Sequence, residues 1–310
     1  MKHPKTTVIG SINGDISFAV DQFPRINETI LANHSTLCMG GKGLNQAIAA
    51  ARAGAITTMI GCVGMDSIGD KAIAYAKDNG LDLAGIKRVS HTSTGTAGIL
   101  VNTDRENMIV VSPGANACLT PDDLHTHADL ITGADMVIVQ LEVPPDTVRA
   151  VLDIAAKAGV RTLFNPAPAT PAAADLIACA DIITPNESET QTITGIYPHD
   201  EASAHEAANA LCARGAKDVL ITMGEAGYYV FSKGEGQYFT AFVVNAVDPT
   251  GAGDVFNGVL ARLLASHATL YEAARHASAA AALSVQCPGA EGAAPDWLQI
   301  QDFLTQNTPL

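Results

Sequence analysis

Short runs of apolar and β-branched residues alternate along the chain with longer, alanine-rich stretches of helical periodicity. The apolar runs predict buried strands at 6–12, 57–63, 134–141, 160–165, 181–184 and 218–223. The longer stretches predict helices at 43–53, 67–79, 145–158, 200–214, 252–266 and 269–286. This alternation is typical of stacked βαβ units around a mainly parallel sheet, so the chain is predicted to have an α/β fold.

Two regions, 15–37 and 94–112, break this rhythm because their apolar runs have no helix between them. The second region turns at the polar positions 103–106. Together they predict a small antiparallel sheet built from two excursions, which would serve as a lid or pack against a copy of itself. A third antiparallel pair, at 227–232 and 237–244 with a turn at 233–236, is expected at the edge of the main sheet.

Composition and charge narrow the classes of partner. The 310 residues are 47% hydrophobic and 16% charged, as expected for a folded protein with one large core and a small appendage. The 18 Lys and Arg residues against 32 Asp and Glu give a net charge of −14, which argues against binding nucleic acid or anionic lipid. No apolar run approaches the ~18 residues of a membrane span, and the N-terminal segment lacks the apolar core of a secretion signal. We therefore expect a cytoplasmic location and no membrane partner.

The cysteines and histidines form no metal-binding pattern. Six cysteines are scattered without a C-x-x-C pair or zinc-like histidine spacing: Cys38, Cys62, Cys118, Cys179, Cys212 and Cys287. We interpret them as small buried hydrophobic residues in a reducing compartment, with a catalytic thiol as the alternative. The nearby His125 and His127 are interpreted as a solvated helix face.

One segment, VDPTGAGDVFNG at 247–258, is a candidate anion site. The chain has no G-x-x-x-x-G-K-[ST] motif, and no G-x-G-x-x-G follows the first strand. Gly251, Ala252 and Gly253 stand where a strand region meets a helix, and free N–H groups there attract anions. Asp254 follows them although it is itself negative. It is either a reactive carboxylate or a first-turn residue that complements the helix dipole.

Two further segments combine glycines with polar side chains. Asn13-Gly14-Asp15 places an amide and a carboxylate two residues apart, suited to gripping vicinal hydroxyls. The stretch 40–46, GGKGLNQ, brings glycines, one cation and amides to the start of a helix. A strand-ending turn and a helix N-terminus are the respective alternatives. With the anion segment, they favour a site for a polyol and a phosphate.

The chain resembles the ribokinase-like sugar kinases of the PfkB family over nearly its whole length. The resemblance is carried by GSINGDI near the start, GGKGLNQAIAA at 40–50, QLEVP at 140–144, NPAPA at 165–169, ITPNESE at 183–189, ITMGEAG at 221–227 and VDPTGAGDVFNG at 247–258. It implies a three-layer α/β sandwich with a mainly parallel central sheet. The core would comprise 1–13, 38–93 and 113–310. The β-sheet lid would comprise 14–37 and 94–112 and would form a homodimer through the lid sheets.

The resemblance also implies transfer of the ATP γ-phosphoryl group to a sugar hydroxyl. Ribose is the favoured acceptor, and deoxyribose or another related sugar is the alternative. A nucleoside kinase or a non-catalytic sugar-binding protein is less favoured, and a dinucleotide-dependent oxidoreductase lacks its phosphate fingerprint. Asp254 would be the general base beside N–H groups of Gly251, Ala252 and Gly253. The sugar would be held by Asn13, Asp15, Gly41, Lys42, Asn45 and Glu142, with Lys42 alternatively a charge partner of Glu142 or Asp15.

By the same resemblance, Asn186, Thr222, Gly224 and Ser278 would line the nucleotide. Asn186 and Glu189 would organise Mg²⁺ through water, although PNESE at 185–189 also fits a helix cap. A monovalent cation, K⁺, would be held mostly through backbone carbonyls by Asp248, Thr250, Ser284, Cys287 and Gly289. Two positions depart from the family pattern: Ala293 occupies a usual serine position, and Ser278 a frequent histidine position.

Overall fold

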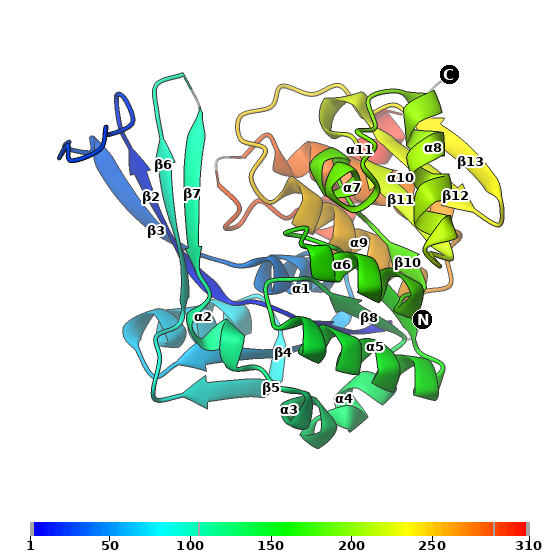
Figure 1. The fold of residues 1–310 in the computed structure, drawn as a ribbon, viewed down its shortest axis with the longest axis horizontal. Coiled ribbons are helices and arrows are strands. Elements are labelled where there is room, and N and C mark those ends of the chain that lie inside the picture. The colour runs from blue at the N-terminus through cyan, green and yellow to red at the C-terminus, as the bar shows by residue number, and fades with distance from the viewer. Residues whose placement is uncertain (1–2, 105, 288, 308–310) are drawn as a thin grey trace.

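The computed structural model describes residues 3–104, 106–287 and 289–307 and arranges them around two sheets (Figure 1). The larger is nine-stranded, in the order β13-β12-β11-β10-β9-β8-β1-β4-β5. Neighbours from β5 to β11 run parallel, whereas β12 and β13 are antiparallel. Its strands are β1 (Lys5–Ile9), β4 (Ile56–Gly64), β5 (Asp82–Val89), β8 (Met136–Val139), β9 (Arg161–Phe164), β10 (Ile182–Ile183), β11 (Asp218–Thr222), β12 (Tyr228–Ser232) and β13 (Glu235–Phe239).

Helices cover both faces of this sheet. One layer contains α1 (Lys42–Arg52), α2 (Ser67–Asp78), α9 (Ala252–Ala265), α10 (Leu270–Ser284) and α11 (Trp297–Gln306). The other contains α3 (Pro121–Thr126), α4 (Ala128–Thr132), α5 (Pro145–Ala158), α6 (Pro171–Leu176), α7 (Glu187–Thr194) and α8 (Glu201–Ala213). Successive strand residues alternate between the two cores, as Val8 and Ile9 of β1 do. The predicted three-layer α/β sandwich is confirmed.

A second, four-stranded sheet projects from the body (Figure 1). It has the order β3-β2-β6-β7, with β2 (Asn13–Ala19), β3 (His34–Gly40), β6 (Gly95–Val101) and β7 (Asn107–Ser112). The expectation of an antiparallel sheet is wrong for its central pair, because β2 and β6 are parallel. These two strands follow β1 and β5 of the parallel sheet and leave the body in the same direction. Arg105, in the predicted turn at 103–106, lies outside the described residues.

The sequence pattern misses some elements and places others slightly wrongly. Strand β5, the short helices between 114 and 132, and helices α6 and α11 have no counterpart in the prediction. The β12–β13 pair does form the edge of the main sheet, but its turn is only Lys233-Gly234, at φ of 54° and 84°. Positive φ at both positions suits a two-residue hairpin turn, so β13 begins at Glu235. It ends at Phe239 rather than 244.

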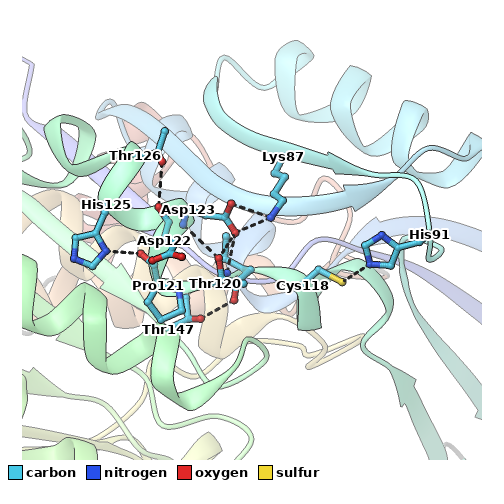
Figure 2. A network of polar contacts seen from close by, with 11 residues as sticks. Lys87, His91, Cys118, Thr120, Pro121, Asp122, Asp123, His125, Thr126 and Thr147 are labelled. Carbon is cyan, nitrogen blue, oxygen red and sulfur yellow. Dashed lines mark hydrogen bonds and ion pairs between the residues drawn. The ribbon is translucent and has the colours of Figure 1, made fainter.

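Polar contacts tie α3 to strand β5, and α5 to the segment just before α3 (Figure 2). Lys87 on β5 donates to both carboxylate oxygens of Asp123 at 2.8 Å. Asp123 also forms a capping box with Thr120 at the start of α3. His125 is exposed and its ring bonds to the Pro121 carbonyl at 2.8 Å, as expected for a residue on a solvated helix face.

All six cysteines are unpaired, but the expectation that they are buried is wrong for most of them. Cys62 is buried in the sheet, Cys287 is exposed and the other four are partly exposed. The partly exposed ones include Cys118, whose sulfur lies 3.8 Å from a ring nitrogen of His91 (Figure 2). Across the described ranges, no helix combines the length and hydropathy needed to cross a bilayer.

Candidate active site

A polar cavity of about 170 Å³ opens where parallel strands of the main sheet end and where α1, α7 and α9 begin. Ligands bind at this end of the strands in open α/β sheets. The cavity brings together seven of the residues predicted for the site. Its lining consists of Lys42, Asn165, Ala167, Thr184, Asn186, Glu189, Thr222, Gly251, Gly253, Asp254 and Asn257.

Asp254 lies in the first turn of α9 and is only 8% exposed. Gly251 immediately precedes the helix at φ 80°, a left-handed conformation that favours glycine. This turn directs the start of α9 toward the helix α1. Asn45 donates to Asp254 Oδ2 at 3.1 Å, and Gln46 donates to Oδ1 at 2.9 Å. Both carboxylate oxygens are therefore held by amides.

The N–H groups around Asp254 are not equivalent. The Ala252 N–H donates to the Pro249 carbonyl at 3.2 Å. Among the described residues, the N–H groups of Gly251 and Gly253 have no backbone acceptor. A Cβ atom placed on Gly253 would meet nothing within 4 Å. Gly251 and Gly253, rather than all three predicted residues, thus present free donors to the cavity.

Asp15 on β2 faces the same region from the small sheet. Burial, together with the nearby carboxylates of Glu142 and Asp254, raises the pKa of Asp15 to about 6. Its Oδ1 is buried and has no hydrogen-bond partner. A buried acceptor without a donor is costly, and a hydroxyl group of a ligand would satisfy it.

Asn13 lies at the base of β2 and is 3% exposed. Asn116 donates from Nδ2 to Asn13 Oδ1 at 2.7 Å, and accepts from the Ile12 N–H at 2.9 Å. Because the Asn13 oxygen is taken, its amide nitrogen is the group left to donate. Asn13 and Asp15 therefore offer one donor and one acceptor, as expected for a site that binds hydroxyl groups.

Glu142 lies close to Asp15, and Lys42 contacts Glu142 through its backbone and lines the cavity. The Ser11 hydroxyl and the Lys42 N–H both donate to Glu142 Oε2. Gly41 precedes α1 at φ 93°. Within the described chain, no carboxylate oxygen lies within 4.0 Å of the Lys42 ammonium, so the alternative of a direct ion pair is not supported.

The charge on Lys42 is nevertheless stabilised by its surroundings. Burial alone would lower the pKa of the Lys42 ammonium, but the carboxylates of Asp254, Glu142 and Glu189 outweigh it and raise that pKa. Lys42 is thus a cation held near three anions without direct contact with any of them. Such a group is available to an anionic ligand in the cavity.

Asn186 and Glu189 form the helix cap that was the alternative interpretation. The Asn186 Oδ1 accepts from the Glu189 N–H and from the Ser188 hydroxyl, each at 2.9 Å. The Asn186 N–H in turn donates to Glu189 Oε2 at 2.9 Å. The oxygen of Asn186 is therefore used by the cap, and its amide nitrogen is the group left for an acceptor such as a phosphate oxygen.

Glu189 retains a second carboxylate oxygen beside the cavity. Burial raises the pKa of Glu189, although the Asn186 N–H and the Lys42 charge oppose this. A divalent cation would relieve the cost of burying this carboxylate. Mg²⁺ keeps most of its water when bound, so one carboxylate together with phosphate oxygens fits it.

The remaining residues predicted to line the nucleotide do not all lie beside the cavity. Thr222 ends β11 and lines the cavity, and Gly224 begins the adjacent 3₁₀ turn, η3 (Gly224–Ala226). Ser278, in contrast, is buried within α10 and does not line the cavity. Thr222 and Gly224 therefore lie beside the cavity at the end of β11, whereas Ser278 lies in a helix outside the cavity lining.

The residues predicted to hold a monovalent cation lie on the loop before α9 and at the end of α10 with the loop that follows it, and Asp248 joins these two segments. Its carboxylate accepts from the Thr250 N–H and from the Gly289 N–H, each at 2.9 Å. Partial burial opposes ionisation, but these hydrogen bonds lower the pKa of Asp248. In the second loop the Cys287 N–H donates to the Ser284 carbonyl at 3.1 Å.

An ionised carboxylate flanked by backbone carbonyls fits a monovalent cation. Ala293 is buried beside these loops and lines a second small cavity with Thr250 and Gly251. In the ranges that the structure describes, no group of three or more His, Cys, Asp or Glu side chains could hold a metal ion by itself. Any cation here would therefore depend on backbone oxygens or a bound phosphate.

Beyond Ser11 and Asn116, five more buried polar residues of the site were not among the predicted ones: Gln46, Gln140, Asn165, Thr184 and Asn257. All five lie within the segments that carry the family resemblance. Gln140, Asn165 and Thr184 directly follow the ends of three adjacent strands, which is the signal that could have identified them. The buried oxygens Thr184 Oγ1 and Asn257 Oδ1 have no hydrogen-bond partner and lie on residues that line the cavity.

The chain is similar to known carbohydrate kinases in sequence and in fold. The family model of the pfkB family carbohydrate kinases matches residues 4–297. The chain is 40% identical to the ribokinase of Haemophilus influenzae, covering 96% of this chain and 97% of that protein. It is 34% identical to the deoxyribokinase of Salmonella typhi, covering 97% and 98%. The structure of Arabidopsis thaliana ribokinase complexed with ribose and ATP superposes with a TM-score of 0.90 at 30% identity, covering 98% of this chain and 99% of that one.

Proposed function

The chain belongs to the pfkB family of carbohydrate kinases, and on this premise we propose that it is an ATP-dependent ribose kinase that makes ribose 5-phosphate. The proposal depends on the position of Asp254. Its buried carboxylate lies at the start of a helix, between free N–H groups and the residues proposed to bind hydroxyl groups. Its role as general base requires this position, because the proton donor and the migrating phosphoryl group must both lie beside it.

Asp254 is the proton acceptor in the proposed reaction. The primary hydroxyl of the sugar gives its proton to the carboxylate as its oxygen forms a bond to the γ-phosphorus. The bond from that phosphorus to the bridging oxygen breaks, and ADP leaves with the bonding electrons. The N–H groups of Gly251 and Gly253, with Lys42, stabilise the charge on the phosphoryl oxygens.

The sugar is proposed to lie between the two sheets. Asp15 accepts from one hydroxyl and Asn13 donates to another, while Glu142, Gly41 and Asn45 border the same space. The orphaned Asp15 Oδ1 supports this assignment, since a sugar hydroxyl would satisfy it. The segments 14–37 and 94–112, which carry most of the small sheet, would then act as a lid over the sugar, with the core formed by 1–13, 38–93 and 113–310.

The nucleotide and its cations are assigned to the opposite side of Asp254. Asn186, Thr222 and Gly224 would border ATP, and Glu189 would hold Mg²⁺ through water. Mg²⁺ when bound would supply positive charge to the phosphate oxygens. The Asp248 loops would hold K⁺, with Ala293 leaving one hydroxyl fewer than the family pattern. Ser278 stays a predicted nucleotide contact, although it lies outside the lining of the cavity.

We also propose that the chain forms a homodimer through its small sheet. Residues paired across strands share a face, so Leu37, Leu100, Met108 and Val110 lie on the face opposite to Asp15. Met108 and Val110 are 53% and 72% exposed. An apolar face of this kind is a liability unless a partner covers it, and a second small sheet would match it. The unpaired cysteines are consistent with a cytoplasmic location, which we include in the proposal.

The substrate is tested with pentoses, hexoses and nucleosides, each assayed with MgATP. We expect ribose to give the highest kcat/KM. Deoxyribose is the second candidate because of the similarity to a deoxyribokinase. Higher kcat/KM with deoxyribose would move the assignment to that sugar. Strong turnover of a nucleoside with none of any free sugar would refute the proposal.

A further inference from the structure

Gln46 lies between Asp254 and the ends of the central strands and has no exposed surface. Its Nε2 donates to Asp254 Oδ1 at 2.9 Å and to Asn165 Oδ1 at 3.1 Å. Its Oε1 accepts from Gln140 Nε2 at 2.7 Å. Because the side chain is fully buried, Gln46 contacts Asp254 without being able to contact a substrate.

The neighbours of Gln46 fix the direction of its amide. Asp254 when ionised can only accept, so the opposite orientation would place oxygen against oxygen. Asn165 presents its oxygen to the same nitrogen because its own Nδ2 donates to the Thr184 carbonyl at 2.9 Å. Gln140 completes the arrangement by donating to the Gln46 oxygen, and a Cβ atom on Gly10 would lie 2.0 Å from Gln140 Oε1, so this amide is closely confined.

The two donors to Asp254 differ in their surroundings. Asn45, which donates to Oδ2, is partly exposed and lines the second small cavity beside Gly251. It can exchange Asp254 for a ligand, whereas the buried Gln46 cannot. Oδ2 is therefore the oxygen that becomes free to accept a proton when a sugar arrives.

We infer that Gln46, supported by Gln140 and Asn165, is a positioning residue that holds Asp254 Oδ1 so that Oδ2 faces the acceptor hydroxyl. The inference rests on the proposed function, in which Asp254 is the base. Gln46 stabilises the ionised carboxylate and limits its rotation through one directional hydrogen bond. It links the orientation of the base to the rigid ends of three strands.

The test uses Gln46→Met, which keeps the length of the side chain and removes its hydrogen bonds. We expect kcat for the preferred sugar to fall by about 10–100-fold, because misplacing a reacting group by about 1 Å costs up to about 10²-fold. The KM for the sugar should stay close to that of the wild type, since Gln46 does not touch it. The sugar affinity measured by calorimetry should be similarly unchanged.

A double-mutant cycle separates positioning from packing. In the background of Asp254→Asn, Gln46→Met should cause no further loss of the residual turnover, because its effect passes through the removed base. Should Gln46→Met fail to fold, Gln140→Met provides the second variant. It removes only the donor to Gln46, so a smaller loss of kcat is expected, again absent in the Asp254→Asn background.

The possible results are distinct. An unchanged kcat in Gln46→Met, or an equal loss with and without the Asp254 carboxylate, would overturn the inference while leaving the proposed function intact. An enzyme whose wild-type form phosphorylates no sugar would overturn the proposed function itself, and the inference with it.

Discussion

Gly40 and Asp15 lie on adjacent strands of the small sheet so closely that a Cβ atom on Gly40 would come within 2.1 Å of Asp15 Oδ2. Gly40→Ala should therefore displace the carboxylate while leaving the fold intact, because the end of a side chain can move. We expect the KM for the sugar to rise about 10-fold or more, which matches the loss of a hydrogen bond to a charged group, about 1.5–3 kcal/mol. Steady-state kinetics with sugar as the varied substrate measures this effect.

Gly98→Ala is the matched control, because it lies in the same small sheet and a Cβ atom there meets only Val110, at 3.4 Å. Its KM should stay close to the wild-type value. Equal KM changes in the two variants would mean that the effect comes from the sheet as a whole rather than from Asp15.

Asp254→Asn tests the assignment of the base. General-base catalysis contributes about 10²–10⁴-fold, so we expect kcat to fall by that factor while the sugar still binds. Single-turnover kinetics and calorimetry measure the two quantities separately. Asp70→Asn is the control, since Asp70 is also an aspartate in the first turn of a helix, but lies at the exposed start of α2. Wild-type turnover in Asp254→Asn would leave Asp254 as a helix-dipole residue.

The strands and helices of the main core are largely predictable because burial makes them apolar at regular intervals. Strand β5 is missed because only two of its eight residues, Gly85 and Val89, are buried. The parallel pairing of β2 with β6 also escapes the prediction. Each strand is locally compatible with either direction, and only the common exit from the body determines which one forms.

The candidate site is predictable where one segment supplies both a glycine turn and a reactive group, as at Gly251 and Asp254. The contacts of Gln46 with Gln140 and Asn165 are not, because they join residues 94 and 119 positions apart. The sequence around a glutamine does not distinguish a buried side chain that bonds to Asp254 from one that only ends a strand. The family resemblance identifies such segments without giving the hydrogen bonds inside them.

The sugar affinity should depend on the protonation of Asp15. Its pKa is raised from 3.8 to about 6, so folding favours its neutral form. The contribution of this neutral form to the free energy of unfolding is fully present below pH 3.8 and is lost as the pH rises through about 6. Sugar binding should show the opposite trend, because hydroxyl groups bond more strongly to the ionised carboxylate. We expect the calorimetric affinity to decrease as the pH falls below about 6, with proton release on binding near that pH.

Asp15→Asn provides the control for this titration. The variant should bind sugar more weakly at every pH and should lose the decrease in affinity below about pH 6. If the decrease persists in Asp15→Asn, another group of the site causes it.

Potassium should raise turnover through the Asp248 loops. These loops flank Gly251, so a cation there would order the N–H groups that face the phosphoryl oxygens. We expect higher kcat in K⁺ than in a large organic cation at the same ionic strength. Ala293→Ser should lower the K⁺ concentration required, because it supplies one more oxygen. Identical rates in both cations for both proteins would remove K⁺ from the proposal.

Val110→Asp should separate the proposed dimer into monomers. Val110 is 72% exposed on the face of the small sheet opposite to Asp15, so in a dimer it would be buried against the partner sheet. Burying an unpaired carboxylate at such a contact is costly, and the equilibrium should shift toward monomer. Light scattering after size exclusion at micromolar concentration gives the mass of each species. Val243→Asp is the matched control, because Val243 is 99% exposed in the loop after β13, outside the small sheet. A wild-type protein of monomer mass would contradict the dimer directly, and a dimer unaffected by Val110→Asp would place its interface elsewhere.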